Sequence, residues 1–320
     1  MPDETLSAEP FHQGERALQA RAGVREQLAQ ASPRLIRDHL PEQHRTFFAS
    51  LPFIVTGTVD GAGQPWASIL ASPPGFIQSP DPRHLVVHAL PLPADPLHET
   101  LLEGADIGLL GIQAHTRRRN RANGVLQQVG EGAFTVKILQ SFGNCPRYIQ
   151  AREASYVNHL GRPVVAVHAS DALDVVARRM IEAADTFFIA TAYTGNRQEA
   201  GRAAGVDVSH RGGKPGFVRV DADGALTVPD FPGNFFFNTL GNIVINPRAG
   251  LLFIDFATGD LLYLAVTAEI IWSGAEVDSF AGAQRLLRFQ VKSVRRVEAS
   301  LPLRWSAAEL SPLLKAAHAG

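Results

Sequence analysis

Residues 208–217 hold the densest group of side chains that could do chemistry. Ser209, His210 and Arg211 stand directly before Gly212 and a second glycine. Glycines let a backbone come close to a planar or phosphorylated ligand, and the imidazole and guanidinium groups can donate hydrogen bonds to its oxygen atoms. A solvated hairpin turn has the same composition and explains this segment equally well on its own. The segment is therefore a candidate ligand loop.

Residues 228–242 combine short amide side chains with aromatic rings. Asn and Thr side chains, together with free backbone N–H groups, can bind phosphate oxygens without a full positive charge. The candidate ligand residues of this segment are Pro229, Asp230, Asn234, Asn238, Thr239 and Asn242. The alternative is structural, because Asn also caps helices and turns, and the three Phe residues at 235–237 suit an ordinary core.

Residues 116–124 contain a run of arginines that includes Arg119 and Arg121. An Arg side chain can hold a phosphate group through two parallel hydrogen bonds. A basic turn or a nucleic-acid contact would also be rich in arginine. However, 30 basic and 31 acidic residues leave a net charge of −1, and no aromatic residue interrupts the run. We therefore expect a structural or anion-binding role and no nucleic-acid partner.

The other chemical candidates are weak. Cys145, the only cysteine, lies in a Gly-Asn-Cys-Pro turn with no activating base near it in the sequence. His84 and His88 fall in an expected strand, where their spacing supplies too few ligands for a metal ion. The sequence contains no P-loop, no nucleophile elbow and no pair of catalytic carboxylates. We predict no metal site, and the sequence assigns no catalytic side chain.

Composition places the chain among ordinary globular proteins. With 320 residues, 45% of them hydrophobic, it is long enough for two domains. A single cysteine excludes an internal disulfide framework and fits a reducing cytoplasm. The first ten residues are polar, and no apolar run approaches the roughly 18 residues of a membrane span. We expect an untargeted cytoplasmic protein with no membrane partner.

The elements that must position these residues are mostly strands. Residues 14–50 show helical periodicity interrupted at Pro33 and Pro41, and residues 11–15 suit capping or docking against a sheet. A further helix is expected at 171–184. Short β-branched runs bounded by Gly, Pro or Asp predict strands. Their expected ranges are 53–59, 66–70, 84–89, 106–112, 124–128, 134–139 and 186–193. Such a series is typical of an antiparallel barrel or sandwich.

The strand pattern occurs twice along the chain. Residues 186–193 resemble 52–58, residues 215–218 resemble 74–77, and residues 249–254 resemble 107–112. The last two pairs begin 141 and 142 residues apart. Agreement in order, spacing and type predicts a duplication: a helical extension at 1–50 and two barrel domains at 51–160 and 161–320. Two such barrels would pair within one chain as a pseudo-dimer, and further dimerisation stays open.

The order of these segments resembles a known family. The runs VSHRGGKPGFV, LTVPDFPGN and NTLGNIVINPRAGLLFI, between residues 208 and 254, are similar to flavin-nucleotide-binding proteins related to pyridoxamine 5′-phosphate oxidase. The run VKILQSFGNCPRYIQ, at 136–150, is similar to a segment that ends the barrel in that family. The resemblance extends from about residue 51 onward and implies tandem FMN-binding split barrels.

The resemblance also implies roles for particular residues. Ser209, His210, Arg211 and Gly212 would flank the flavin ring, while Asn234, Asn238, Thr239 and Asn242 would serve the phosphate or ribityl chain. The other half would offer Ser141, Asn144, Cys145 and Arg147. The family usually has a basic residue where this chain has Phe235 and Phe236. Arg119 and Arg121 could supply the missing charge.

Three functions follow, in order of preference. The first is an FMN-dependent oxidoreductase acting on a small redox substrate, with NADH or NADPH as a possible electron donor and one strong flavin site. The second is a non-enzymatic module that binds flavin or another planar cofactor. The third is an anion- or nucleic-acid-binding barrel that uses the arginine run.

Overall fold

The computed structural model describes residues 9–158 and 166–316, and antiparallel sheets dominate it, as the sequence predicts. The first sheet has the order β2-β1-β5-β6-β7-β4-β3. Its strands are β1 Phe53–Val59, β2 Pro65–Ala71, β3 Ile77–Gln78, β4 His84–Val87, β5 Asp106–Gln113, β6 Arg118–Gly130 and β7 Ala133–Gly143. Strands β1 and β2 pair as an antiparallel hairpin across the turn that contains Asp60 and Gly63.

The second sheet has the order β11-β10-β14-β15-β16-β13-β12. Its strands are β10 Thr186–Tyr193, β11 Gly205–Gly212, β12 Arg219–Val220, β13 Leu226–Asp230, β14 Arg248–Ile254, β15 Leu261–Ile271 and β16 Arg285–Val297. Strand β9, Val167–Ser170, pairs with β16 beside this path. A small separate sheet joins β8, Ala154–Tyr156, to β17, Leu303–Trp305.

Position by position, the two sheets have the same strand order. In each main path, the two strands that come first in the sequence form one edge, and the next two form the other. The first pair is β1 and β2 or β10 and β11, and the next is β3 and β4 or β12 and β13. The three pairs of similar segments fall on equivalent places: β1 with β10, β5 with β14, and the turns that precede β3 and β12. The expected boundary at 160/161 lies within residues 159–165, which are outside the described part of the chain.

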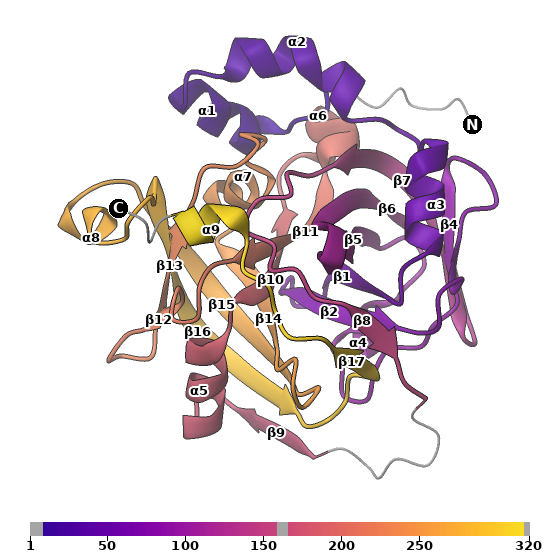
Figure 1. Cartoon of the computed structure of the whole chain (residues 1–320). Coiled ribbons are helices and arrows are strands. Elements are labelled where there is room, and N and C mark those ends of the chain that lie inside the picture. The colour runs from indigo at the N-terminus through magenta and orange to yellow at the C-terminus, as the bar shows by residue number, and fades with distance from the viewer. Residues whose placement is uncertain (1–8, 159–165, 317–320) are drawn as a thin grey trace.

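Helices surround the sheets. They are α1 Gln13–Arg21, α2 Arg25–Leu35, α3 Glu42–Ala49, α4 Leu97–Thr100, α5 Val175–Ala183, α6 Arg197–Ala200, α7 Asn238–Ile245, α8 Ala275–Asp278 and α9 Pro312–Ala316, with 3-10 turns at Ala114–Thr116 and Gly201–Ala203. In Figure 1, α1 and α2 lie above the sheets, and α3 lies beside the first sheet. No helix in the described ranges is long and apolar enough to span a membrane.

Three large apolar cores, and a smaller fourth one that contains Phe11 and Phe236, hold the described part of the chain together. One lies within the first sheet and includes Phe48 of α3, and another lies within the second sheet and includes Ile181 of α5. The third contains side chains of both sheets, such as Val55 of β1 and Phe188 of β10. Burial of apolar surface stabilises by about 25 cal/mol per Å², so this shared core joins the two sheets firmly. Figure 1 shows β1 and β2 close to β10 and β14 at this junction.

Two glycines permit the closest approach of the sheets. A Cβ atom on Gly108 of β5 would lie 2.6 Å from the carbonyl oxygen of Val206 in β11. A Cβ atom on Gly250 of β14 would lie 2.7 Å from the Cα of Trp66 in β2. The two contacts are reciprocal, because each joins the fifth strand of one main path, counted along the chain, to the second strand of the other. Both are backbone contacts, so a side chain at either position has no space.

Three local expectations differ from the structure. Pro33, expected to interrupt the helical pattern, lies inside α2, and the helix ends two residues later. Strand β6 begins at Arg118, ahead of the expected residue 124, because its arginines pair with β5 in regular register. Residues 238–245 form helix α7, where no helix was expected.

Candidate functional site

A cleft lies where the first sheet meets the second. Strand β6 and the segment after β7 form one wall, and β11, the segment after β13 and the start of α7 form the other. Every predicted site residue lines it except Ser141 and Asn242. Those that line it are Arg119, Arg121, Asn144, Cys145, Arg147, Ser209, His210, Arg211, Gly212, Pro229, Asp230, Asn234, Asn238 and Thr239.

The two exceptions make other contacts. Ser141 is fully buried, and its Oγ lies 3.1 Å from Nδ1 of His44 in α3. Asn242 lies deeper in α7, where its Nδ2 donates to Asp207 Oδ2 at 2.9 Å and to Thr191 Oγ1 at 3.1 Å. Asn242 therefore supports the second sheet from behind the cleft.

Arg121 of β6 links the two walls. Its Nη1 donates to Asp207 Oδ1 at 2.7 Å, and its Nη2 donates to the hydroxyl of Ser209, both on β11. Thr239 of α7 also donates to Ser209 Oγ, at 3.0 Å. The Arg121 side chain is almost fully buried, so this ion pair is shielded from solvent. One guanidinium thus fixes the position of β6 against β11 at the cleft.

Arg119 differs because its charge has no acidic partner. Its Nε donates to the carbonyl oxygen of Cys145 at 2.8 Å, and its Nη1 to that of His210 at 3.3 Å. No carboxylate in the described ranges forms an ion pair with it. Burial, then the charges of Arg121 and Arg211, lowers the pKa of Arg119 to about 10. A bound anion would offset this concentration of positive charge.

Several other donors in the cleft lack an acceptor. Within the described residues, Arg121 Nε, Asn144 Nδ2 and Arg211 Nε are buried and have no hydrogen-bond partner. The carboxylate of Asp230 is already taken, since Arg211 Nη1 donates to its Oδ1 at 2.6 Å. Buried N–H groups without acceptors are costly, at about 1–3 kcal/mol each. Their convergence indicates a ligand that is rich in acceptor atoms.

His210 adds an uncharged group to the cleft. Burial, together with the charges of Arg119 and Arg211, lowers its pKa well below the ordinary value for histidine. The imidazole is therefore neutral at physiological pH, with one nitrogen as donor and the other as acceptor.

Aromatic side chains form the outer part of the cleft, and the sequence did not identify all of them. Tyr148 stacks on Phe231 with ring centroids 5.1 Å apart. Tyr148, Phe235 and Phe237 have φ values of 63°, 61° and 62°. Bulky residues rarely adopt this left-handed conformation, and such strain collects at functional sites. No residue pattern marks these φ values, so the sequence could not have revealed them.

Strand β15 of the second sheet corresponds to β6 of the first, but it lacks the two arginines that line the cleft. In β15, Tyr263 pairs with Leu252, and Leu261 pairs with Ile254. In β6, the same places opposite β5 belong to Arg121 and Arg119. An aromatic and an aliphatic side chain thus replace the two arginines.

That position is also filled. The Tyr263 hydroxyl donates to Asp95 Oδ2 at 2.8 Å, and the Ser68 hydroxyl donates to Asp95 Oδ1 at 2.5 Å. All three residues are essentially inaccessible to solvent. A polar cluster of the protein itself occupies this place.

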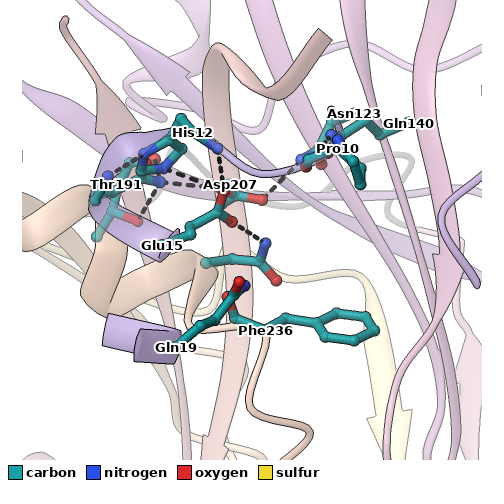
Figure 2. Close-up of polar contacts among 12 residues, drawn as sticks. Pro10, His12, Glu15, Gln19, Asn123, Gln140, Thr191, Asp207 and Phe236 are labelled. Atoms are coloured by element: carbon teal, nitrogen blue, oxygen red, sulfur yellow. Dashed lines mark hydrogen bonds and ion pairs between the residues drawn. The ribbon is translucent and has the colours of Figure 1, made fainter. Parts of the chain in front are cut away.

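Behind the cleft, residues of α1 meet α7 and β11 in a buried polar cluster (Figure 2). His12 caps α1 by accepting from the backbone N–H of Gly14 at 3.1 Å, as part of a capping box with Glu15. This is the capping and docking role expected of residues 11–15. Sequence reasoning did not foresee that Glu15 would contact Asn238, whose side chain lines the cleft.

The fold and the cleft define a two-sheet antiparallel β protein with a cationic cleft between the sheets. No protein-family model matches the chain, and no curated protein sequence matches it. Three similar solved structures each correspond to a part of this chain.

A Lactobacillus delbrueckii protein provisionally named a pyridoxamine 5′-phosphate oxidase is 18% identical and covers 33% of this chain and 95% of its own, with a TM-score of 0.27. A FAD-binding protein from Mesorhizobium loti is 12% identical, covers 41% and 97%, and has a TM-score of 0.27. HutZ, a haem storage protein from Vibrio cholerae, is 13% identical, covers 40% and 95%, and has a TM-score of 0.27. At sequence identities and TM-scores this low, the similarity to these three structures gives no information on what this chain binds.

Proposed function

We propose that the cleft binds a flavin nucleotide, FMN, and that the chain is an FMN-dependent oxidoreductase for a small redox substrate, with NADH or NADPH as electron donor. The observation that carries the proposal is Arg119, a cation without an acidic partner, surrounded by buried donors without acceptors. FMN offers what these groups lack, because its phosphate is anionic and its ring carries carbonyl oxygens and nitrogen acceptors. The sequence resemblance to flavin-nucleotide-binding proteins points to the same ligand.

The residues of the cleft divide naturally between the two ends of such a ligand. Arg119, Asn144 and the Nε of Arg121 would hold the phosphate through charge-assisted hydrogen bonds. The β11 residues Ser209 to Gly212 would lie along the ring. When bound, a flavin supplies hydride or electron transfer, and the protein supplies orientation and electrostatics. The neutral imidazole of His210 can offer one hydrogen-bond donor and one acceptor to the ring.

We further propose that residues 51–160 and 161–320 are two split barrels of a tandem pseudo-dimer, with residues 1–50 as a helical extension. The shared strand order and the reciprocal contacts of Gly108 and Gly250 support this arrangement. Because Asp95 and Tyr263 fill the corresponding position, we expect one flavin per chain rather than two.

The test begins with the visible spectrum of the purified protein and a titration with FMN, followed by chromatographic identification of any released yellow ligand. Arg119→Gln removes a charge-assisted hydrogen bond, worth about 1.5–3 kcal/mol, so affinity should fall about 10- to 150-fold. Arg83→Gln is the matched control, because Arg83 pairs with Asp38 on the exposed surface away from the cleft. A colourless protein that takes up no added FMN refutes the proposal.

Reduction kinetics separate the enzyme from a binding module. Rapid bleaching of the bound flavin by NADH or NADPH supports the oxidoreductase. Flavin that binds stoichiometrically but is not reduced by either nucleotide would indicate a protein that stores or senses the cofactor. Added haem serves as a second planar probe in the same titration, and tight haem binding that excludes FMN would contradict the flavin assignment.

A further inference from the structure

Helix α1 and the residues just before it pack against the rear of both cleft walls. On the side of the second sheet, a Cβ atom on Gly241 of α7 would lie 2.7 Å from a backbone nitrogen of α1, so only glycine allows this approach. Gln19 of α1 donates to the carbonyl oxygen of Phe236, just before α7, at 3.2 Å (Figure 2). On the side of the first sheet, Gln140 of β7 donates to the carbonyl oxygen of Pro10 at 2.8 Å. The N-terminal segment therefore contacts both sheets beside the cleft.

The side chain of Phe236 is buried at this junction. Its ring centroid lies 5.5 Å from that of Phe11, which precedes α1, and 5.7 Å from that of Phe142 in β7. All three residues are at most 5% exposed, and we call their rings the aromatic cluster. Leu28 and Ile36 complete the small core around it. One ring of the second cleft wall is thus held between the N-terminal segment and the first sheet.

The residues on either side of Phe236 line the cleft. Phe235 and Phe237 have φ values of 61° and 62°, and both belong to the outer part of the cleft. A left-handed conformation is strained for a bulky residue and persists only where the surrounding structure enforces it. Asn234 contributes one local bond, since its Oδ1 accepts from the Phe236 N–H at 3.1 Å. The buried ring of Phe236 supplies the stronger constraint, because it is fixed in the aromatic cluster between the two strained residues.

The aromatic cluster also supports the opposite wall. The guanidinium carbon of Arg121 lies 5.3 Å from the ring centroid of Phe142, within the range of a cation–π contact. Arg121 joins β6 to β11 through its bonds to Asp207 and Ser209, and its Nε has no partner among the described residues. Phe11 itself does not line the cleft. It is therefore connected to both walls without touching the ligand position.

We propose that Phe11 is a positioning residue of the cleft: its ring holds Phe236 against Phe142 and thereby keeps the wall residues beside Phe236 in their left-handed conformation. The identity of the ligand rests on the proposed function, but the role of Phe11 does not depend on the reaction. If the ring of Phe11 is removed, the strained wall can relax, and a ligand then binds only the smaller fraction of molecules that retain the competent wall. Release of one left-handed residue corresponds to a loss of about 5- to 150-fold in affinity.

The first test compares the FMN affinity and the urea stability of full-length variants. Phe11→Ala should bind FMN about 5- to 150-fold more weakly at unchanged stoichiometry, and Phe11→Leu, which keeps most of the volume, should lose less. Phe134→Ala and Phe134→Leu are the matched controls, because Phe134 is similarly buried, at the start of β7 in the core of the first sheet. They should lose comparable stability and keep the wild-type affinity. If an alanine variant does not fold, the two leucine variants decide the comparison.

A second measurement separates positioning from ordinary support of the fold. Glycine adopts a φ near 61° without strain, so in a Phe235→Gly background the aromatic cluster has less strain to hold. The factor lost on Phe11→Ala should therefore be smaller in that background than in the wild type. A residue that only stabilises the fold would cost the same factor in both backgrounds. The ratio within each background cancels any contact that Phe235 itself makes with FMN.

Limited digestion with chymotrypsin, which cleaves after aromatic residues, reports on the wall without any ligand. When local opening is fast, the cleavage rate follows the population of the open form. Cleavage at residues 235–237 should therefore be about 5- to 150-fold faster in Phe11→Ala than in the wild type, and unchanged in Phe134→Ala.

Each result supports or overturns the inference. An affinity loss confined to the Phe11 variants, together with faster cleavage of the wall, supports it. Wild-type affinity in Phe11→Ala, an equal loss in the Phe134 variants, or the same factor in both backgrounds overturns the positioning role and leaves the proposed function intact. If the wild type binds no FMN, the proposed function fails, and the digestion alone decides whether Phe11 holds the wall.

Discussion

Replacing Gly250 by alanine tests how the two sheets are held together. The new Cβ would lie 2.7 Å from the Cα and 2.8 Å from the carbonyl carbon of the facing residues Trp66 and Pro65, and real Cβ atoms do not come so close. These are backbone atoms of β2, which is tied to β1 by a full antiparallel ladder, so they cannot move aside alone. The sheets must separate locally, and overpacking of this kind costs about 1–3 kcal/mol.

Urea denaturation of Gly250→Ala, followed by tryptophan fluorescence, measures this cost as a lower midpoint at unchanged slope. Gly130→Ala is the matched control, because Gly130 is an exposed strand residue whose added Cβ would meet nothing closer than 3.7 Å. The reciprocal change Gly108→Ala should have a similar effect, and the double variant should lose less than the sum, since one separation relieves both contacts. Equal stability of Gly250→Ala and Gly130→Ala would show that the sheets do not meet in this way.

Three other outcomes follow from the structure. Equilibrium dialysis with FMN should saturate at one ligand per chain, and a value of two would contradict a position closed by Asp95 and Tyr263. Tyr263→Phe leaves the buried Asp95 without one donor, so urea denaturation should report a loss of about 1–3 kcal/mol. Arg152→Ala leaves the buried carboxylate of Asp185 without its partner, because Arg152 Nη2 and Nη1 donate to its Oδ2 and Oδ1 at 2.7 and 3.2 Å. The expected loss in the free energy of unfolding is about 3–5 kcal/mol. A loss below about 1 kcal/mol would indicate that solvent reaches this pair.

The sequence predicted strands best where local pattern and environment agree. Strands β1 and β10 have the expected ends, because β-branched and aromatic residues there are buried on both faces and turn residues follow β1. Strand β6 was harder to recognise, since an arginine run resembles a solvated turn. Arg121 is buried there only because Asp207, 86 residues later, meets it from the other sheet. Charge pairing over such distances has no local signature.

The candidate site was predicted in the same uneven way. Glycines, amides and arginines mark the cleft, because their chemistry is visible one residue at a time. Helix α7 was missed because Asn, Thr and Gly weaken its helical signal, and the contact with α1 supplies the missing stability. The contact of Glu15 with Asn238 was missed because an acidic residue in the first turn of a helix normally faces solvent, and the two residues are 223 positions apart.

That long separation affects the chain while it is being made. Glu15 leaves the ribosome with its helix, but Asn238 follows only 223 residues later. At about 5–20 residues per second, translation leaves the polar face of α1 without its partner for about 11–45 s. During this interval the Glu15 side chain is surrounded by water and has no contact with the cleft wall. The cleft is therefore completed late in synthesis, when α7 arrives and packs against the waiting N-terminal helix.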